Sequence, residues 1–198
     1  MKFIAVTNRS LCHDDKDFFT RIESLCDVLR KGDKILLREP KLEVPEYTTL
    51  AEECRDICHD TPIHLLLHTH FETAKALHLK QVHLPMALLR VGIPIGYRCS
   101  ASVHSVEEAI EAQKLGAEFL IAGHIYTTDC KKGLPPRGVD FLKAVCDSVD
   151  IPVYAIGGIT PEKVPELKAA GATGICVMSA LMTCDDPVDV VRQFQSFL

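Results

Sequence analysis

Eight short apolar segments alternate with amphipathic segments along the whole of this 198-residue sequence. Several of them are apolar almost throughout, which is typical of parallel strands buried on both faces. The predicted strands are residues 2–8, 34–38, 63–68, 81–84, 95–103, 119–126, 153–156 and 175–179. Strict alternation of strand and helix predicts an α/β fold with a parallel sheet and right-handed crossovers, either open and doubly wound or closed as a (β/α)8 barrel.

The segments between the strands carry helix signals. Residues 16–29 place apolar side chains at spacings near 3.6, and Ser105 is a capping signal for a helix over 106–115. The weakest unit lies between 84 and 95, where only 87–91 can form a short helix. Eight units average about 25 residues each, at the compact end of the range for barrels. We therefore predict one domain over 1–198, a single (β/α)8 TIM barrel.

Composition narrows the class of protein. The net charge is −5, from 22 Lys+Arg and 27 Asp+Glu. The chain therefore has no excess of basic residues of the kind that nucleic-acid-binding proteins show. No apolar run approaches the roughly 18 residues that span a membrane. The nine cysteines are odd in number and include no CxxC pair, which favours free thiols over a disulfide framework. We expect a cytoplasmic protein that binds neither nucleic acid nor membrane.

The strongest local signal lies after the last two predicted strands. Gly157 and Gly158 follow one of them and precede a helix, while the small residues Ser179 and Ala180 stand at the end of the other. Backbone N–H groups of glycines can approach a phosphate closely, and barrels commonly hold phosphate at these two loops. The alternative is that the two glycines only make a tight turn. We expect a phosphate site here.

Histidines mark other predicted strand ends. His124 lies near the carboxyl end of the sixth predicted strand, where it could move protons at neutral pH or could simply hold a loop. His68 and His70 stand two residues apart, so that both could point to one face, with His83 as a third metal ligand. Few carboxylates stand nearby, so we predict no metal site. The basic, Gly/Pro-rich segment 131–138 is either a solvated loop or a lid for an anionic substrate.

Six motifs, in order, resemble the thiamine phosphate synthase superfamily, whose members are (β/α)8 barrels. They are LRE at 37–39, QVHL at 81–84, SVHS at 102–105, GHIYTT at 123–128, PVYAIGGI at 152–159 and VMS at 177–179. Together they cover nearly the whole chain.

The sequence departs from the synthase pattern at several motif positions. The synthase motif Gln-Leu-Arg-Glu-Lys is Leu-Leu-Arg-Glu-Pro at 36–40, and its two Mg²⁺-binding aspartates are replaced by Thr69 and Leu88. Neither can supply an anionic oxygen to a hard cation. These losses imply that synthase chemistry, which expels pyrophosphate, is disabled.

The same departures resemble the TenI-type thiazole tautomerases, in which a histidine stands at the position of His124. The resemblance implies an isomerase of thiamine biosynthesis that aromatises a phosphorylated carboxythiazole by proton transfer through His124, with no cofactor. It implies a homo-oligomer whose ligand is a small thiazole phosphate carboxylate. The ligand-binding residues it implies are Arg38, Ser102, Thr128, Lys131, Gly157, Gly158, Ser179 and Ala180. The alternatives are a synthase-like transferase and an inactive ligand-binding regulatory barrel.

Overall fold

The eight strands close into a parallel barrel in which each strand pairs with its neighbours in sequence order and β8 pairs with β1. The computed structural model describes all 198 residues. The strands are β1 (Lys2–Val6), β2 (Lys34–Leu37), β3 (His64–His68), β4 (Gln81–Pro85), β5 (Arg98–Val103), β6 (Ala117–Gly123), β7 (Val153–Ile156) and β8 (Gly174–Val177). The predicted (β/α)8 barrel is confirmed, and the open, doubly wound alternative is excluded.

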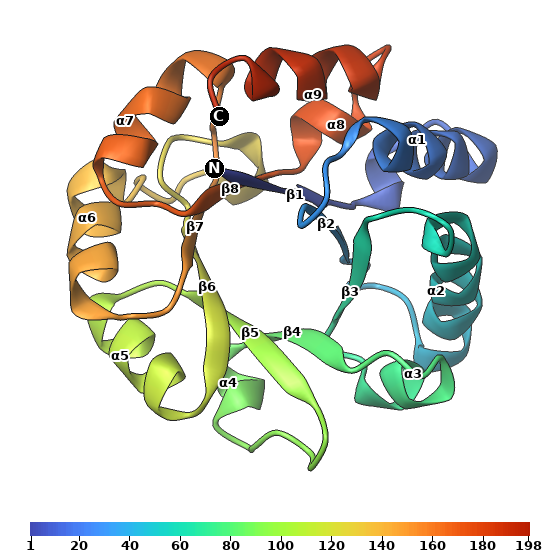
Figure 1. Cartoon of the computed structure of the whole chain (residues 1–198), viewed down its shortest axis with the longest axis horizontal. Coiled ribbons are helices and arrows are strands. Elements are labelled where there is room, and N and C mark those ends of the chain that lie inside the picture. The colour runs from blue at the N-terminus through green and yellow to red at the C-terminus, as the bar shows by residue number, and fades with distance from the viewer.

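Helices surround the barrel on all sides, as Figure 1 shows in a view close to the barrel axis. They are α1 (Asp15–Val28), α2 (Val44–Cys58), α3 (Phe71–Ala76), α4 (Met86–Leu89), α5 (Val106–Lys114), α6 (Gly138–Ser148), α7 (Val164–Ala169), α8 (Ser179–Met182) and α9 (Pro187–Gln195). Three 3-10 turns, η1 (Arg9–Leu11), η2 (Asp129–Lys131) and η3 (Pro161–Lys163), lie in loops that follow strands. None of these helices has both the length and the apolar character that crossing a membrane demands.

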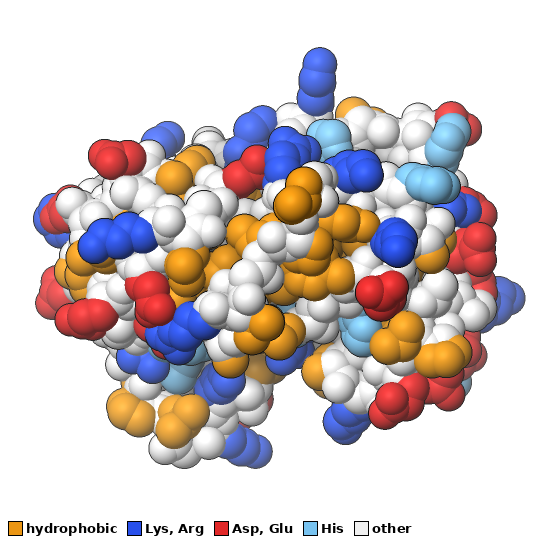
Figure 2. All heavy atoms as spheres, turned by 90° about the horizontal axis from the view of Figure 1, so that it is seen from below, with side chains coloured by type: hydrophobic (Ala, Val, Ile, Leu, Met, Phe, Trp, Pro, Cys, Tyr) orange, Lys and Arg blue, Asp and Glu red, His pale blue; other side chains and the backbone are white.

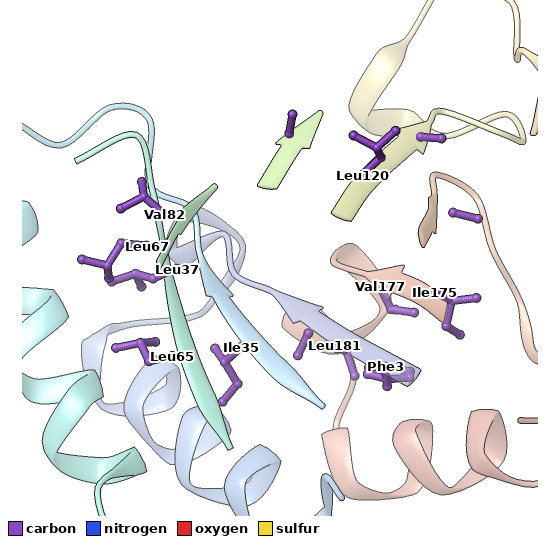
Figure 3. Packing of buried hydrophobic residues seen from close by; sticks show 14 of the residues in the cluster. Phe3, Ile35, Leu37, Leu65, Leu67, Val82, Leu120, Ile175, Val177 and Leu181 are labelled. Carbon is purple, nitrogen blue, oxygen red and sulfur yellow. The ribbon is translucent and has the colours of Figure 1, made fainter. Parts of the chain in front are cut away.

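Alternation along the strands divides the apolar side chains into two layers. On β1, Ile4 and Val6 point into the barrel, whereas Phe3 and Ala5 face the helices. The inner cluster is Ile4, Val6, Leu36, Leu66, Phe119, Ile121, Tyr154 and Cys176. The larger outer cluster fills the space between strands and helices, and Figure 3 shows part of it around β1, β2, β3 and β8. The inner layer makes the barrel a packed core, so ligands can reach only its ends.

Local signals explain where two of the outer helices begin. Asp14 caps α1 by accepting a hydrogen bond from the backbone N–H of Asp17 at 2.8 Å, and Ser105 caps α5 through the N–H of Glu108 at 3.1 Å. The buried face of α1 carries Phe18, Ile22, Leu25 and Cys26 at helical spacing. The capping prediction at Ser105 is therefore confirmed.

Two strand ends differ from the predicted ones by three residues each. β5 begins at Arg98 rather than residue 95, because Ile95 lies fully in solvent and Gly96 turns the chain with a φ of +85°. β6 ends at Gly123, and the peptide that joins it to His124 is cis. His124 therefore lies in the loop after β6 and is not part of the strand.

The helical layer is thinnest at α4, which has a single turn. Three apolar side chains are exposed here: Leu88 in α4, and Val91 and Ile95 in the loop that follows it. Helix α4 and this loop lie at the bottom of Figure 1. Figure 2 shows the molecule from that side, and apolar side chains gather near the centre of the view. The unit that the sequence marked as weakest thus has a single helical turn and leaves apolar side chains exposed.

The buried Tyr47 of α2 links this helix to the barrel through hydrogen bonds of its hydroxyl group. Its hydroxyl donates to the carbonyl of Leu37 at 2.7 Å and accepts from the N–H of His68 at 3.1 Å. Tyr47→Phe removes both hydrogen bonds, so we expect the free energy of unfolding to fall by about 1–3 kcal/mol. Urea denaturation measures the loss, and an unchanged midpoint would contradict this role.

Candidate functional site: the carboxyl ends of the strands

The loop after β7 presents two backbone donors. Gly157 and Gly158 have φ angles of +102° and +64°, and neither N–H makes a hydrogen bond within the chain. A side chain at 158 would meet the carbonyl oxygen of Thr127 and, at 2.9 Å, the Cβ of Tyr126. Both positions therefore require glycine, because the backbone is left-handed and the neighbouring chain leaves no space for a Cβ.

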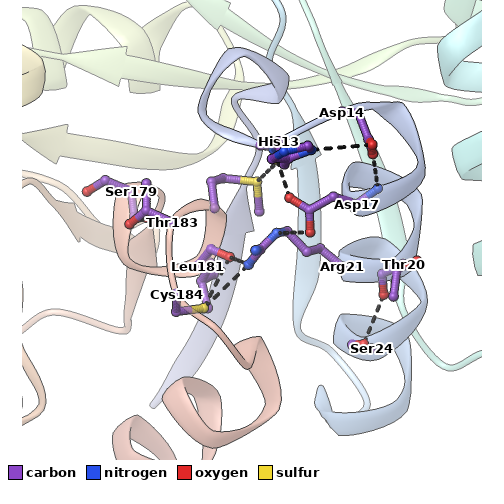
Figure 4. Close-up of polar contacts among 12 residues, drawn as sticks. His13, Asp14, Asp17, Thr20, Arg21, Ser24, Ser179, Leu181, Thr183 and Cys184 are labelled. Atoms are coloured by element: carbon purple, nitrogen blue, oxygen red, sulfur yellow. Dashed lines mark hydrogen bonds and ion pairs between the residues drawn. The ribbon is translucent and has the colours of Figure 1, made fainter.

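The start of α8 lies beside this loop, because β8 pairs with β7. Ser179 and Ala180 are the first residues of α8 and are exposed, and the first N–H groups of any helix lack intrahelical acceptors. Arg21 of α1 donates to the carbonyl of Leu181 at 3.1 Å, which fixes α8 against α1 (Figure 4). The structure therefore brings four of the predicted phosphate-binding residues together.

His124 packs directly on the glycine loop. A Cβ at Gly157 would lie 2.8 Å from the His124 Cα, so the two backbones are in contact. The His124 side chain is 9% exposed, and its Nε2 has no hydrogen-bond partner. A buried polar atom without a partner is rare, and a polar ligand atom at this place would satisfy it.

Two residues that the sequence did not assign hold the backbone at His124. His104 donates through Nδ1 to the carbonyl of Gly123 at 2.8 Å, and Arg137 donates through Nε to the same oxygen at 3.2 Å. The backbone N–H of Arg137 also donates to the carbonyl of His124 at 3.0 Å. In the sequence, His104 only follows a predicted strand and Arg137 only lies in a basic loop. Neither feature predicts that both side chains donate to the carbonyl of Gly123.

Two neutral histidines lie on the opposite side of the barrel mouth. The rings of His68 and His83 are 5.9 Å apart, and His83 contacts the hydroxyls of Ser100 and Ser102 at 2.8 and 2.7 Å. Burial, followed by nearby positive groups that include Arg38, lowers the pKa of His83 to about 3 and that of His68 to about 4. The predicted site residue Ser102 is therefore engaged by His83.

His70 does not join this pair. Its ring stacks on Tyr47 with the centroids 3.9 Å apart, behind the strand. Thr69 has a φ of +68°, which ends the regular alternation of side chains after His68. The hypothesis that His68 and His70 share one face is therefore wrong, because it assumed that the strand continues through Thr69.

Arg38 is a free cation on this side of the mouth. It follows β2, and its guanidinium forms no ion pair and no hydrogen bond. It lines a cavity of about 490 Å³ between the loops after β1 and β2. Next to it, Glu39 is buried, and its carboxylate accepts from the Thr7 hydroxyl at 2.7 Å and the Arg9 N–H at 2.9 Å. Burial raises the pKa of Glu39 above its usual value.

The structure does not bring Thr128 and Lys131 to the glycine loop through any contact. Thr128 caps η2, where its hydroxyl accepts weakly from the N–H of Cys130 at 3.4 Å. Lys131 is exposed and forms no ion pair. Their roles as ligand-binding residues stay predictions.

The residues at the mouth do not fit the Mg²⁺ ion of the synthase pattern. The hydroxyl of Thr69 donates to the carbonyl of His68 at 2.6 Å, and Leu88 is a partly exposed hydrocarbon side chain. No three His, Cys, Asp or Glu side chains come together as ligands anywhere in the chain. Mg²⁺ prefers carboxylate and phosphate oxygens, and neither Thr69 nor Leu88 offers one.

Fold and site together define a (β/α)8 barrel with unpaired backbone donors after β7, in the region where such barrels bind phosphate. A family model described as thiamine monophosphate synthase matches residues 3–181. The chain belongs to this family.

Individual relatives agree with that assignment. The chain is 30% identical to thiamine-phosphate synthase 2 of Streptococcus pneumoniae serotype 4, over all of this chain and 94% of that protein. It is 31% identical to the thiamine-phosphate synthase of Methanospirillum hungatei, over 90% of each chain. The solved thiamine phosphate pyrophosphorylase of Pyrococcus furiosus superposes with a TM-score of 0.82 at 24% identity, covering 99% of this chain and 94% of that one.

These comparisons correct one expectation. The resemblance to tautomerases implied an isomerase, whereas the curated relatives reported above are named thiamine-phosphate synthases, which are transferases. The isomerase prediction is therefore contradicted. Membership of a thiamine biosynthesis family is confirmed.

Proposed function

We propose that this chain is a transferase of the thiamine-phosphate-synthase type. It would join a phosphorylated thiazole to a pyrimidine that carries a pyrophosphate, with the pyrophosphate leaving. The observation that carries the proposal is the pair of unpaired backbone donors at Gly157 and Gly158 in a chain of this family. They suit the phosphate of the thiazole partner, with Ser179 and Ala180 beside them.

The proposed ligand-binding groups lie on two sides of the barrel mouth. On one side, the glycine loop would hold the thiazole phosphate, and the buried Nε2 of His124 would hydrogen-bond to that ligand. On the other side, Arg38 is the free cation that would meet the pyrophosphate, or the carboxylate of a thiazole phosphate carboxylate. His68 and His83 are neutral there and serve as hydrogen-bonding groups, not as charges.

The test is formation of thiamine phosphate from the two substrates, followed by mass spectrometry, with and without added Mg²⁺. We expect product, and we expect Arg38→Ala and His124→Ala to lower its rate by about 10-fold or more, the loss typical of a buried or charged hydrogen bond to a ligand. Arg98→Ala is the matched control, because Arg98 lies at the start of β5, at the opposite end of the barrel. It should retain the full rate.

A second candidate is a ligand-binding barrel without turnover. Thr69 and Leu88, at the positions of the synthase carboxylates, favour it. Calorimetric binding of the thiazole phosphate without any thiamine phosphate formed, under all metal conditions, would support this candidate and contradict the transferase.

A cytoplasmic location and a homo-oligomeric assembly also stay predictions. Sedimentation analysis of the purified chain tests the assembly, and a monomer at all concentrations would contradict it.

A further inference from the structure

Two thiols from neighbouring helices meet in the outer layer of the fold, away from the proposed ligand site. Cys26 lies near the end of α1 and Cys58 is the last residue of α2. Their sulfurs are 3.4 Å apart, and the two residues are only 6% and 5% exposed. Each is packed in the apolar cluster between helices and strands. The cysteine count of the sequence did not indicate this contact.

The surroundings make the two thiols unequal. The two sulfurs share one hydrogen bond, in which either thiol can be the donor. This contact and the Thr61 hydroxyl together lower the pKa of Cys26 despite burial. The same contact raises the pKa of Cys58. Cys26 is therefore the better nucleophile of the pair, because the thiolate is the reactive form of cysteine.

A third cysteine provides an internal comparison. Cys54 precedes Cys58 by one helical turn on α2 and is fully buried, but its sulfur makes no contact with another sulfur. Burial raises the pKa of the Cys54 thiol. These cysteines do not form a metal site, since no three ligating side chains come together in the chain. Position in the helix interface, and not burial alone, sets the Cys26–Cys58 pair apart.

We propose that Cys26 and Cys58 are an oxidation site that closes to a disulfide when the protein meets a peroxide. The Cys26 thiolate attacks one peroxide oxygen, so that an S–O bond forms as the O–O bond breaks; the product is a sulfenic acid, and the leaving hydroxide takes up a proton and departs as water. The Cys58 sulfur then attacks the Cys26 sulfur, the S–S bond forms and the S–O bond breaks, with release of a second water. The two thiols lose two electrons and the peroxide gains them.

The helix packing needs little change for this reaction. A disulfide has an S–S distance of about 2.05 Å, so the sulfurs must approach by about 1.4 Å from their present separation. Rotation about the side-chain bonds can supply much of this, because the helices are already in contact. The bond would close a loop of 32 residues that contains β2 and Arg38. The disulfide would therefore restrict the motion of the segment that carries Arg38.

The experiment uses the whole chain in a Cys130→Ser background, because the exposed Cys130 could otherwise form disulfides between molecules. The protein is fully reduced, treated with hydrogen peroxide and digested without reductant for peptide mapping. We expect a Cys26–Cys58 peptide, two fewer thiols under denaturing conditions, and a Tm higher by roughly 5–10 °C, since a loop of this size is constrained in the unfolded state.

Three variants separate this site from general oxidation. Cys26→Ser and Cys58→Ser should lose both the linked peptide and the rise in Tm, whereas Cys54→Ser should keep both. If a serine variant does not fold, the peptide map of the parent protein alone decides. Oxidation that leaves Cys26 and Cys58 reduced, or that links either one to another cysteine, would overturn the proposal. None of these outcomes depends on the transferase activity.

Discussion

Gly157→Ala should remove phosphate binding and destabilise the barrel together. The residue has a φ of +102°, and an added Cβ would lie 2.8 Å from the His124 Cα. The chain after β7 or the chain after β6 must then move, which displaces the unpaired N–H groups. We expect the free energy of unfolding to fall by roughly 2–4 kcal/mol, from backbone strain and overpacking together.

The binding readout is titration calorimetry with inorganic phosphate and with a small phosphate monoester. The affinity should drop at least 10-fold in the variant, because hydrogen bonds to a charged group contribute about 1.5–3 kcal/mol each. Gly116→Ala is the matched control, since Gly116 also has a left-handed φ, of +90°, but nothing lies within 4 Å of its added Cβ. It should lose about 1 kcal/mol of stability and keep its affinity. Unaltered phosphate binding by Gly157→Ala would contradict the assignment of this loop.

Acid should destabilise the protein strongly through the histidine pair. The pKa values of His68 and His83 are lowered from 6.5 to about 4 and about 3 in the folded chain. Between these values and pH 6.5, the unfolded state binds more protons than the folded state. Stability is therefore complete above about pH 6.5 and falls as the pH decreases, by up to about 1.4 kcal/mol per pH unit for each histidine.

From pH 6.5 to 4.5 the two histidines together should remove roughly 3–5 kcal/mol of stability. Below about pH 4 the contribution of His68 levels off, because it is then protonated in both states. Glu39 acts in the opposite direction, since its raised pKa makes its protonation favour the folded state. The wild-type slope alone is thus a sum of several groups.

A variant isolates the histidine contribution. His68→Asn should make the decline shallower by about 1.4 kcal/mol per pH unit in urea denaturation at a series of pH values between 6.5 and 4.5. His64→Asn, on the same strand but exposed, should keep the wild-type slope. If His68→Asn gave the wild-type slope as well, the side chain would not be held neutral in the folded state.

Most of the architecture could be predicted, because burial on both faces leaves a simple pattern in the sequence. All eight strands lie within the predicted segments or differ from them by a few residues at the ends. The errors fall where one backbone angle interrupts a regular pattern. Thr69 ended the alternation that placed His70 beside His68, and Gly96 ended the strand that was expected to begin at 95.

Only part of the candidate site could be predicted from the sequence. Gly157 and Gly158 could be found, because glycines at the carboxyl end of a barrel strand have a direct physical use. The shared acceptor of His104 and Arg137, the carbonyl of Gly123, could not, because residues from two loops meet at one backbone oxygen. Family resemblance suggested an isomerase, whereas the relatives that match over the length of the chain are named thiamine-phosphate synthases.

The sequence by itself determined that the chain folds as eight strand–helix units with two glycines after the seventh strand. Both properties are local, since they follow from periodicity and from residue types at strand ends. Tertiary structure alone decided that His124 has a buried, unpaired nitrogen, that His68 and His83 are neutral, and that Cys26 touches Cys58. These properties depend on distances between segments far apart in the chain, and burial and charge act through those distances.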